Sequence, residues 1–211
     1  MASKRRNRRR RRGRASFPLR FLCLLIVIAA IVAALTMFFR IDMIVVEGNE
    51  RYTEEQIIEA AGVQKEQNLV LLNKYDVKQA IFDALPYVET VVINRKYPDA
   101  LILTVTECAA SAALPGAGGT WLVSDTGKIL ERTAQLPEGC VSVTGCELVE
   151  PAVGAQAAFS DEDSYKLDRL LTLLHAAEEK QLLSMIGSVD LSDGTAITLT
   201  YLDRFTVRMP W

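Results

Sequence analysis

The sequence predicts an α+β protein that is anchored by a single N-terminal transmembrane helix. Three observations carry this prediction. Residues 21–39 form an uncharged apolar run, residues 41–107 show a β-α-α-β-β pattern, and residues 108–211 are β-rich with one long helix. Strand and helix signals grouped in blocks are typical of α+β architecture rather than of alternating βα units. Together with a basic tail over residues 1–20, the chain is expected to have four segments.

The apolar run reads FLCLLIVIAAIVAALTMFF and carries no charge over its 19 residues. A helix of that length spans about 28 Å, close to the roughly 30 Å hydrocarbon core of a bilayer. It is apolar on every face, unlike a helix that packs on a soluble core. A cleaved signal peptide is the alternative, but its apolar core runs about 7–15 residues and ends at a small-residue cleavage site. Met37-Phe38-Phe39-Arg40 follows here instead, so a retained anchor is predicted.

Charge is divided unevenly along the chain. Residues 1–20 hold one Lys and nine Arg, whereas all 26 acidic residues lie in the remainder. Basic residues beside a first membrane helix stay in the cytoplasm, so we predict a cytoplasmic N-terminus and extracytoplasmic domains. The Arg run is interpreted mainly as a topology signal that touches anionic membrane lipid. A nucleic-acid arm and a docking segment for a cytoplasmic partner are the alternatives, and no nucleic acid is expected.

The first exported segment opens with a short strand and a well-marked helix. Residues 43–49 are β-rich and end in turn formers. Thr53, followed three residues later by Gln56, predicts a capping box at the start of a helix. Gly62 is a typical C-terminal residue for that helix.

A second helix and two strands follow. Asp76 is predicted as the N-cap of the helix, and Pro86 ends it because the residue before proline is pushed out of the helical region. Residues 88–95 and 101–107 read as strands joined by a turn at residues 96–99. Two helices on one face of a three-stranded sheet are therefore expected.

These residues carry a resemblance to a known family. The sequence is similar to the POTRA domain of the bacterial division proteins FtsQ and DivIB at a set of positions in two blocks: Val46, Gly48, Asn49, Tyr52, Thr53 and Ile57, then Leu85, Pro86, Tyr87, Val88, Arg95, Tyr97, Pro98, Leu101, Leu103, Val105 and Glu107. The layout of basic tail, membrane helix, POTRA domain and β-rich domain is similar too. Most of these positions are turn formers, caps or core residues, so we expect them to specify the fold rather than a contact.

The resemblance implies a non-enzymatic divisome scaffold in the cell membrane at the division septum. Its implied partners are FtsL-like and FtsB/DivIC-like small coiled-coil division proteins. Two other classes stay open. A POTRA-type chaperone would handle exported polypeptides, and a wall enzyme would act through a site that no motif here identifies.

The second exported segment is predicted to be a β domain with one helix. Residues 109–119 look like a linker between the two modules. The expected elements are a hairpin with a glycine-containing turn at 125–128, a strand near 141–145, a helix from Asp161 to about Lys180 and final strands at 186–191, 197–201 and 205–207.

The residues that usually mark catalytic or metal sites are sparse. The chain has one histidine, His175, and four cysteines without C-x-x-C spacing. No nucleophile elbow, phosphate loop or metal cluster is visible, so no catalytic residue, cofactor, metal or small-molecule substrate is predicted. Whether Cys140 and Cys146 form a disulfide is left open.

The candidate partner-binding residues are Tyr201, Arg204, Phe205 and Val207. They lie near the last predicted strand, and a partner strand could add to that edge through main-chain hydrogen bonds. The resembled family usually continues with another helix and further strands, so a shortened C-terminus that leaves an open edge is expected.

Overall fold

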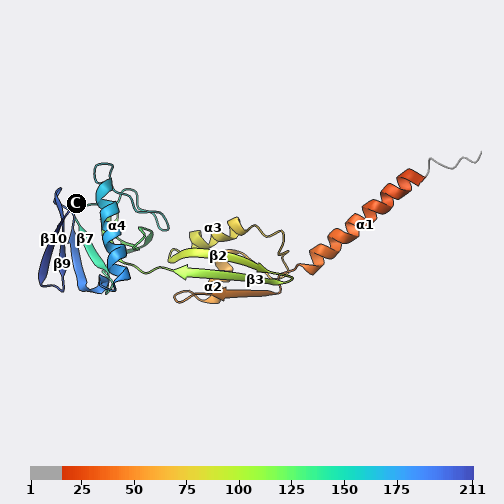
Figure 1. The fold of residues 1–211 in the computed structure, drawn as a ribbon, viewed down its shortest axis with the longest axis horizontal. Helices are drawn as coiled ribbons and strands as arrows, with labels where there is room; N and C mark the ends of the chain where they lie inside the picture. Colours follow the sequence, from red (N-terminus) through yellow and green to blue (C-terminus); the bar gives the residue numbers. More distant parts are fainter. Residues whose placement is uncertain (1–15) are drawn as a thin grey trace, which may run out of the picture.

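The computed structural model describes residues 16–211, and most of the Arg-rich tail lies outside the described residues. Figure 1 shows three parts in a row: a lone helix at one end, a small α+β unit in the middle and a larger sheet with one helix at the other end. The predicted α+β class is confirmed.

The lone helix α1 covers Ser16–Phe38. Within it, Arg20–Phe38 is long and apolar enough to cross a membrane, and none of that stretch is buried inside the protein. A helix whose apolar side chains have no protein partner needs another apolar environment to cover them. The predicted helix is therefore confirmed, and its properties are consistent with a single-pass anchor.

The middle unit is a three-stranded sheet with two helices, in the order β1-β3-β2. Its central strand β3 runs parallel to β1 and antiparallel to β2. The elements are β1 (Met43–Glu47), α2 (Glu54–Ala61), α3 (Lys74–Ala84), β2 (Val88–Lys96) and β3 (Ala100–Glu107). Leu101, Leu103 and Val105 alternate into the core beneath the helices, as the sequence predicts.

The ends of the two helices test the capping predictions. Thr53 and Gln56 form the predicted capping box, and Gly62 follows α2 in the left-handed conformation. For α3 the prediction was wrong: the N-cap is Asn73, whose Oδ1 accepts from the Tyr75 N–H at 3.0 Å. Asn caps a helix as well as Asp does, so the helix begins three residues earlier. Asp76 instead lies in the first turn, where a carboxylate interacts favourably with the helix dipole.

The larger sheet has seven strands in the order β10-β9-β8-β7-β4-β5-β6. Its strands are β4 (Ala112–Gly116), β5 (Gly119–Val123), β6 (Ile129–Thr133), β7 (Val141–Thr144), β8 (Ile186–Asp190), β9 (Ala196–Tyr201) and β10 (Phe205–Pro210). β4, β7 and β8 are parallel neighbours, and the other pairs are antiparallel.

The sheet contains one strand that the sequence analysis placed in a linker. Residues 109–119 were expected to connect the modules, but Ala112, Ala113 and Leu114 are buried in β4, between β5 and β7. A strand that is covered on both faces consists of small or apolar residues and does not alternate between apolar and polar side chains. The composition of this strand is therefore similar to that of a linker.

The helix α4 (Ser164–Glu179) packs on one face of the larger sheet, followed by a short 3₁₀ turn, η1 (Leu183–Met185). Leu170 and Leu174 are fully buried in the same core as Val189 and Leu199 of the sheet. The helix predicted from Asp161 to about Lys180 is confirmed, and its leucines at helical spacing pack in the core.

Gly48 gives a test of the packing between β1 and β3. It has a φ of +83°, and an added Cβ would lie 2.3 Å from the backbone oxygen of Val105. We expect Gly48→Ala to lower the free energy of unfolding by about 2–4 kcal/mol, measured by thermal unfolding of the full chain in detergent.

Gly62→Ala is the matched control, because Gly62 also has a positive φ but no atom within 4 Å of an added Cβ. It should cost only about 1 kcal/mol, the backbone contribution alone. Equal losses at the two positions would contradict the proposed crowding.

Candidate functional site

The strand β10 forms one edge of the seven-stranded sheet. It pairs with β9 from Phe205↔Tyr201 to Pro210↔Ala196. Among the described residues no backbone hydrogen bond joins its outer side to another segment. An unpaired strand edge presents a row of N–H and C=O groups that can bind another strand.

The other edge of this sheet, β6, is covered at its start. Ile129 N–H donates to the Ala155 carbonyl at 2.8 Å, and Gly154 N–H donates to the Ile129 carbonyl at 2.8 Å. Lys128 and Gln156 form a further isolated bridge beside it. The two edges therefore differ: β6 is partly covered within the chain, whereas β10 has free backbone groups along its outer side among the described residues.

The side chains of β10 follow the alternation of the sheet. Residues directly opposite in neighbouring strands share a face, so Val207 lies on the same face as Leu199, which α4 covers. Phe205 is nevertheless 59% exposed and Val207 39% exposed. They extend the apolar face of the sheet beyond the core, as a surface that a further strand could cover.

The turn that leads into β10 has an uncommon backbone. Leu202 and Asp203 both have positive φ, 51° and 53°, and Arg204 N–H donates to the Tyr201 carbonyl at 3.2 Å. This is the geometry of a type I′ turn, which favours Gly, Asn or Asp over Leu. Gly187 of β8 allows the turn, because a Cβ there would lie 2.7 Å from Asp203 Oδ1. The turn presents Leu202 and Arg204 to solvent beside the edge.

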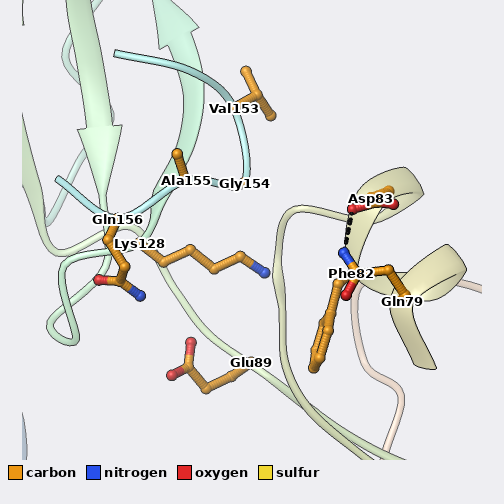
Figure 2. A pocket seen from close by; sticks show the side chains of 9 residues that line it. All are labelled: Gln79, Phe82, Asp83, Glu89, Lys128, Val153, Gly154, Ala155 and Gln156. Carbon is orange, nitrogen blue, oxygen red and sulfur yellow. Dashed lines mark hydrogen bonds between the residues drawn. The ribbon is translucent and has the colours of Figure 1, made fainter. Parts of the chain in front are cut away.

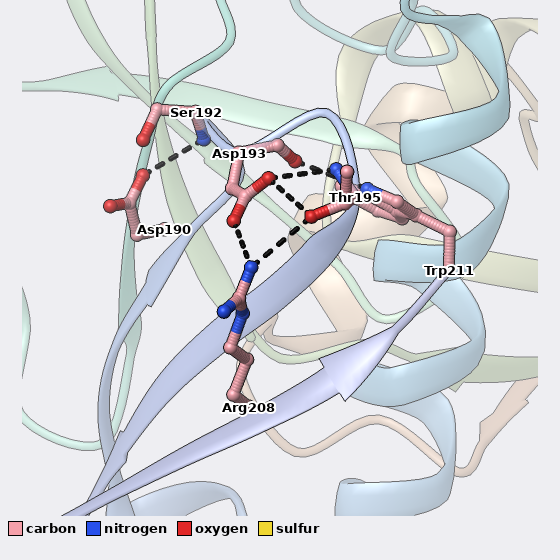
Figure 3. Close-up of polar contacts among 6 residues, drawn as sticks. All are labelled: Asp190, Ser192, Asp193, Thr195, Arg208 and Trp211. Carbon is pink, nitrogen blue, oxygen red and sulfur yellow. Dashed lines mark hydrogen bonds and ion pairs between the residues drawn. The ribbon is translucent and has the colours of Figure 1, made fainter.

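The far end of β10 is held by a polar cluster (Figure 3). Arg208 Nη2 lies 2.5 Å from Asp193 Oδ2, and Asp193 Oδ1 accepts from Thr195 N–H at 2.8 Å. Trp211 Nε1 donates to the Asp193 carbonyl at 3.1 Å, and its ring packs edge-on against Tyr165 of α4. Hydrogen bonds from Thr195, together with Arg208, lower the pKa of Asp193. The cluster fixes β10 to the helix and keeps the edge in place.

The four predicted partner-binding residues are brought together, but only two are on the edge strand. Phe205 and Val207 lie on β10 itself, whereas Arg204 is in the turn. Tyr201 belongs to β9 and is half-buried, and its hydroxyl donates to the Met185 sulfur at 3.1 Å. Sequence reasoning did not single out Leu202, whose left-handed backbone carries no sequence signal here.

Several residues of the POTRA-like motif have structural roles. The Glu107 carboxylate accepts from the backbone N–H groups of Glu50, Arg51 and Tyr52 at 3.2, 2.6 and 3.2 Å. Arg95 donates to the Leu72 carbonyl. These side chains fix loops of the middle unit, so they are poor candidates for partner contacts.

A second polar site lies at the seam between the middle unit and the larger sheet. Lys128, only 8% exposed, extends from the β5–β6 turn toward Phe82 of α3 (Figure 2). Its Nζ donates to the Val88 carbonyl at 2.8 Å and lies 5.2 Å from the centroid of the Phe82 ring. The carboxylate of Glu89 lines the same cavity of about 660 Å³. Burial lowers the pKa of Lys128, which is partly offset by Cys108 and Glu89.

Cys108, Cys140 and Cys146 are free thiols in surroundings that raise their pKa. Burial, followed by the charge of Glu89, raises the pKa of Cys108 to about 11. Burial also raises the pKa of Cys140 and Cys146, which are not joined in a disulfide. A reactive cysteine needs a lowered pKa, so these environments oppose nucleophilic chemistry.

His175 is paired with two acids. Its Nδ1 lies 2.8 Å from Asp125 Oδ2, and its Nε2 lies 3.9 Å from Glu179 Oε1. The hydrogen bond that His175 Nδ1 donates to the Asp125 carboxylate is the largest cause of a raised pKa for His175. The pair joins α4 to the β5–β6 turn on the protein surface, without a hydroxyl or thiol among its polar contacts.

Comparison with known proteins identifies the middle unit. Residues 39–107 match the family model described as POTRA domain, FtsQ-type. The cell division protein FtsQ of Bradyrhizobium diazoefficiens is 29% identical over 93 residues, which is 44% of this chain and 27% of that protein. The cell division protein DivIB of Clostridium botulinum strain Hall is 26% identical over 131 residues, 62% of this chain and 51% of that protein. FtsQ of Corynebacterium glutamicum is 25% identical over 182 residues, 85% of this chain and 75% of that protein.

The fold and these matches define a class of protein: an α+β protein with an N-terminal apolar helix and an FtsQ-type POTRA domain. The homologues named FtsQ and DivIB extend the similarity over much of the chain. The chain thus carries an FtsQ-type POTRA domain and is distantly similar to the cell division proteins FtsQ and DivIB over much of its length, which confirms the resemblance seen in the motif. It spans 27% and 51% of the length of the first two relatives.

Lys128 provides a test of the seam. Lys128→Met keeps an apolar stem but removes the ammonium group that bonds the Val88 carbonyl. We expect a loss of about 1–3 kcal/mol in the free energy of unfolding and faster amide hydrogen exchange at the seam. Lys65→Met, at an exposed position, is the control and should change neither. Identical behaviour of the two variants would show that Lys128 does not hold the seam.

His175 provides a test of pH dependence, since the chain has a single imidazole to follow by NMR. Its folded pKa is raised, so the stabilisation from the Asp125 pair is present in full below the unfolded value of about 6.5 and is lost as pH rises through the folded pKa. Asp125→Asn should move the His175 pKa back down. An unchanged titration in that variant would contradict the role of the pair.

Proposed function

We propose that this protein is a membrane-anchored, non-enzymatic scaffold of the division machinery, acting at the septum. The proposed layout is a cytoplasmic basic tail over residues 1–20, a transmembrane helix over 21–39, an extracytoplasmic POTRA domain over 41–107 and a β domain over 108–211. The FtsQ-type POTRA domain and the similarity to proteins named FtsQ and DivIB support the link to division. The uneven charge of the N-terminal tail supports the orientation.

The observation that carries the scaffold proposal is the open edge of β10. A partner segment adds to this edge as an antiparallel or parallel strand, with main-chain hydrogen bonds giving affinity. Alternate apolar side chains of that segment cover Phe205 and Val207, which are exposed on the face that continues the core. The partners are FtsL-like and FtsB/DivIC-like small division proteins.

The non-enzymatic part of the proposal is supported by the polar sites that the structure describes. The extracytoplasmic thiols have raised pKa values and the His175 pair has only acidic contacts. Between residues 16 and 211, no group of three or more His, Cys, Asp or Glu side chains is arranged to hold a metal ion.

The test combines partner capture with localisation. In the variant Phe205→Asp/Val207→Asp we expect capture of the FtsL-like and FtsB/DivIC-like proteins to weaken about tenfold or more, since burial of a Phe or Val side chain stabilises by about 1.5–3 kcal/mol. The midcell enrichment of an N-terminal fluorescent fusion should fall with it. Folding should change little, because both side chains are exposed.

Val92→Asp is the matched control, because Val92 is 51% exposed on β2, an edge strand of the other sheet. It should leave capture and localisation unchanged. Unaltered capture by the β10 variant would rule out the edge mechanism. An even membrane signal for the unaltered chain, together with binding of many unfolded polypeptides, would instead favour a POTRA-type chaperone. Turnover of cell-wall precursor by the protein would favour an enzyme.

A further inference from the structure

The POTRA domain carries an exposed apolar tip beside the end of α1. The tip is Val70–Leu71, with exposed fractions of 46% and 76%. Its neighbour Leu69 is fully buried in the POTRA core, so the two apolar residues are held outside by the fold. Exposure of two adjacent aliphatic side chains to water is unfavourable in free energy. It therefore indicates that an apolar environment covers them.

Hydrogen bonds hold the backbone of the tip in a defined turn. The Asn68 Oδ1 accepts from the Val70 and Leu71 N–H groups at 2.9 and 3.1 Å, which closes the turn. The same side chain donates through Nδ2 to the Thr36 carbonyl of α1 at 3.4 Å. Leu69 N–H donates to the Phe39 carbonyl at 2.8 Å. Asn68 thus couples the conformation of the tip to the end of the helix.

The position of the tip along α1 sets its depth. Val70 and Leu71 line one groove with Val32 and Leu35, and the lining is almost entirely apolar. Val32 lies six residues before the helix end at Phe38, which is about 9 Å along the helix axis. If residues 21–39 span the bilayer, a side chain level with Val32 and Leu35 lies below the headgroup boundary of the outer leaflet.

An aromatic pair marks the boundary itself. The Phe39 ring packs edge-on against Tyr97, with centroids 5.5 Å apart, and Tyr97 is exposed. Arg40 follows immediately and is exposed. Aromatic rings next to a basic residue are typical of the membrane–water interface. The groove is thus continuous with the surface that α1 presents to lipid.

We propose that the Val70–Leu71 tip inserts into the outer leaflet and binds lipid acyl chains, which fill the groove between the tip and α1. The occupant is lipid because the groove opens onto the helix face that the bilayer itself must cover. Insertion gives the POTRA domain a second contact with the membrane and so limits its rotation about the α1 exit. The inference depends on the membrane anchoring proposed above.

The experiment measures the depth of spin labels in the full chain reconstituted into phosphatidylcholine/phosphatidylglycerol bilayers. A Cys23→Ala/Cys108→Ala parent removes the exposed and the half-buried native thiols, and one cysteine at a time is then introduced as Leu71→Cys, Ile28→Cys or Leu136→Cys. Ile28 lies within α1, and Leu136 is an exposed residue in the loop between β6 and β7 that serves as the aqueous control. Collision of each label with oxygen, which concentrates in lipid, is compared with collision with a water-soluble nickel chelate.

We expect the labels at positions 71 and 28 to collide mainly with oxygen, and the label at 136 mainly with nickel. A label at 71 that collides with nickel, while the one at 28 does not, would overturn the tip proposal and leave the anchor standing. Nickel accessibility at both 28 and 71 would remove the anchor and the tip together. Protection of position 71 from both reagents would mean that protein, such as a second copy or a partner helix, covers the groove, and would also overturn the lipid assignment.

Discussion

The Glu107 carboxylate is the interaction on which the arrangement of the extracytoplasmic part depends. At the end of the central strand β3 it accepts three backbone hydrogen bonds from the loop at residues 50–52. The loop then places Arg51 over the Tyr87 ring, at 3.7 Å from its centroid, and the Tyr52 hydroxyl accepts from the Tyr87 N–H at 3.4 Å. Tyr87 packs in a small buried cluster with residues of the larger sheet: Ala113, Leu122 and Leu130. A charge-assisted contact inside one unit therefore orients the residue that joins it to the next.

Local signals predicted the parts of the fold that local chemistry determines. The capping box at Thr53 and the helix stop at Pro86 act within a few residues, so the sequence alone places them. The strand β4 was missed because its neighbours β5 and β7 determine that residues 112–116 are a strand, and a run of alanines with Pro and Gly does not show this. Lys128 was read as part of a turn, and only the approach of Val88 from another unit makes it buried. Prediction of the candidate site was limited in the same way, since the open side of β10 is a property of strand order.

The two edges of the larger sheet show how the protein controls strand pairing. The backbone of the loop at residues 154–157 pairs with the start of β6, so that part of the edge is closed within the chain. On β10 the outer backbone groups are free among the described residues, while the strand is held firmly from its inner side by β9 and by the Asp193–Arg208–Trp211 cluster. A strand edge that is already ordered loses less conformational entropy when another strand binds to it. The same strand is thus held rigidly on its inner side and left unpaired on its outer side.

The proposed membrane contact and the proposed partner contact lie at opposite ends of the molecule. In Figure 1 α1 is at one end and β10 at the other, with the POTRA unit between them. A partner strand that pairs with β10 therefore acts far from the bilayer, and any partner anchored in the same membrane has to extend past the POTRA domain to reach it. A coiled-coil helix is suited to this because it gains about 1.5 Å per residue and keeps its direction. The Lys128 contact at the seam and the proposed membrane contact of the Val70–Leu71 tip would then set the height and direction at which the edge is presented.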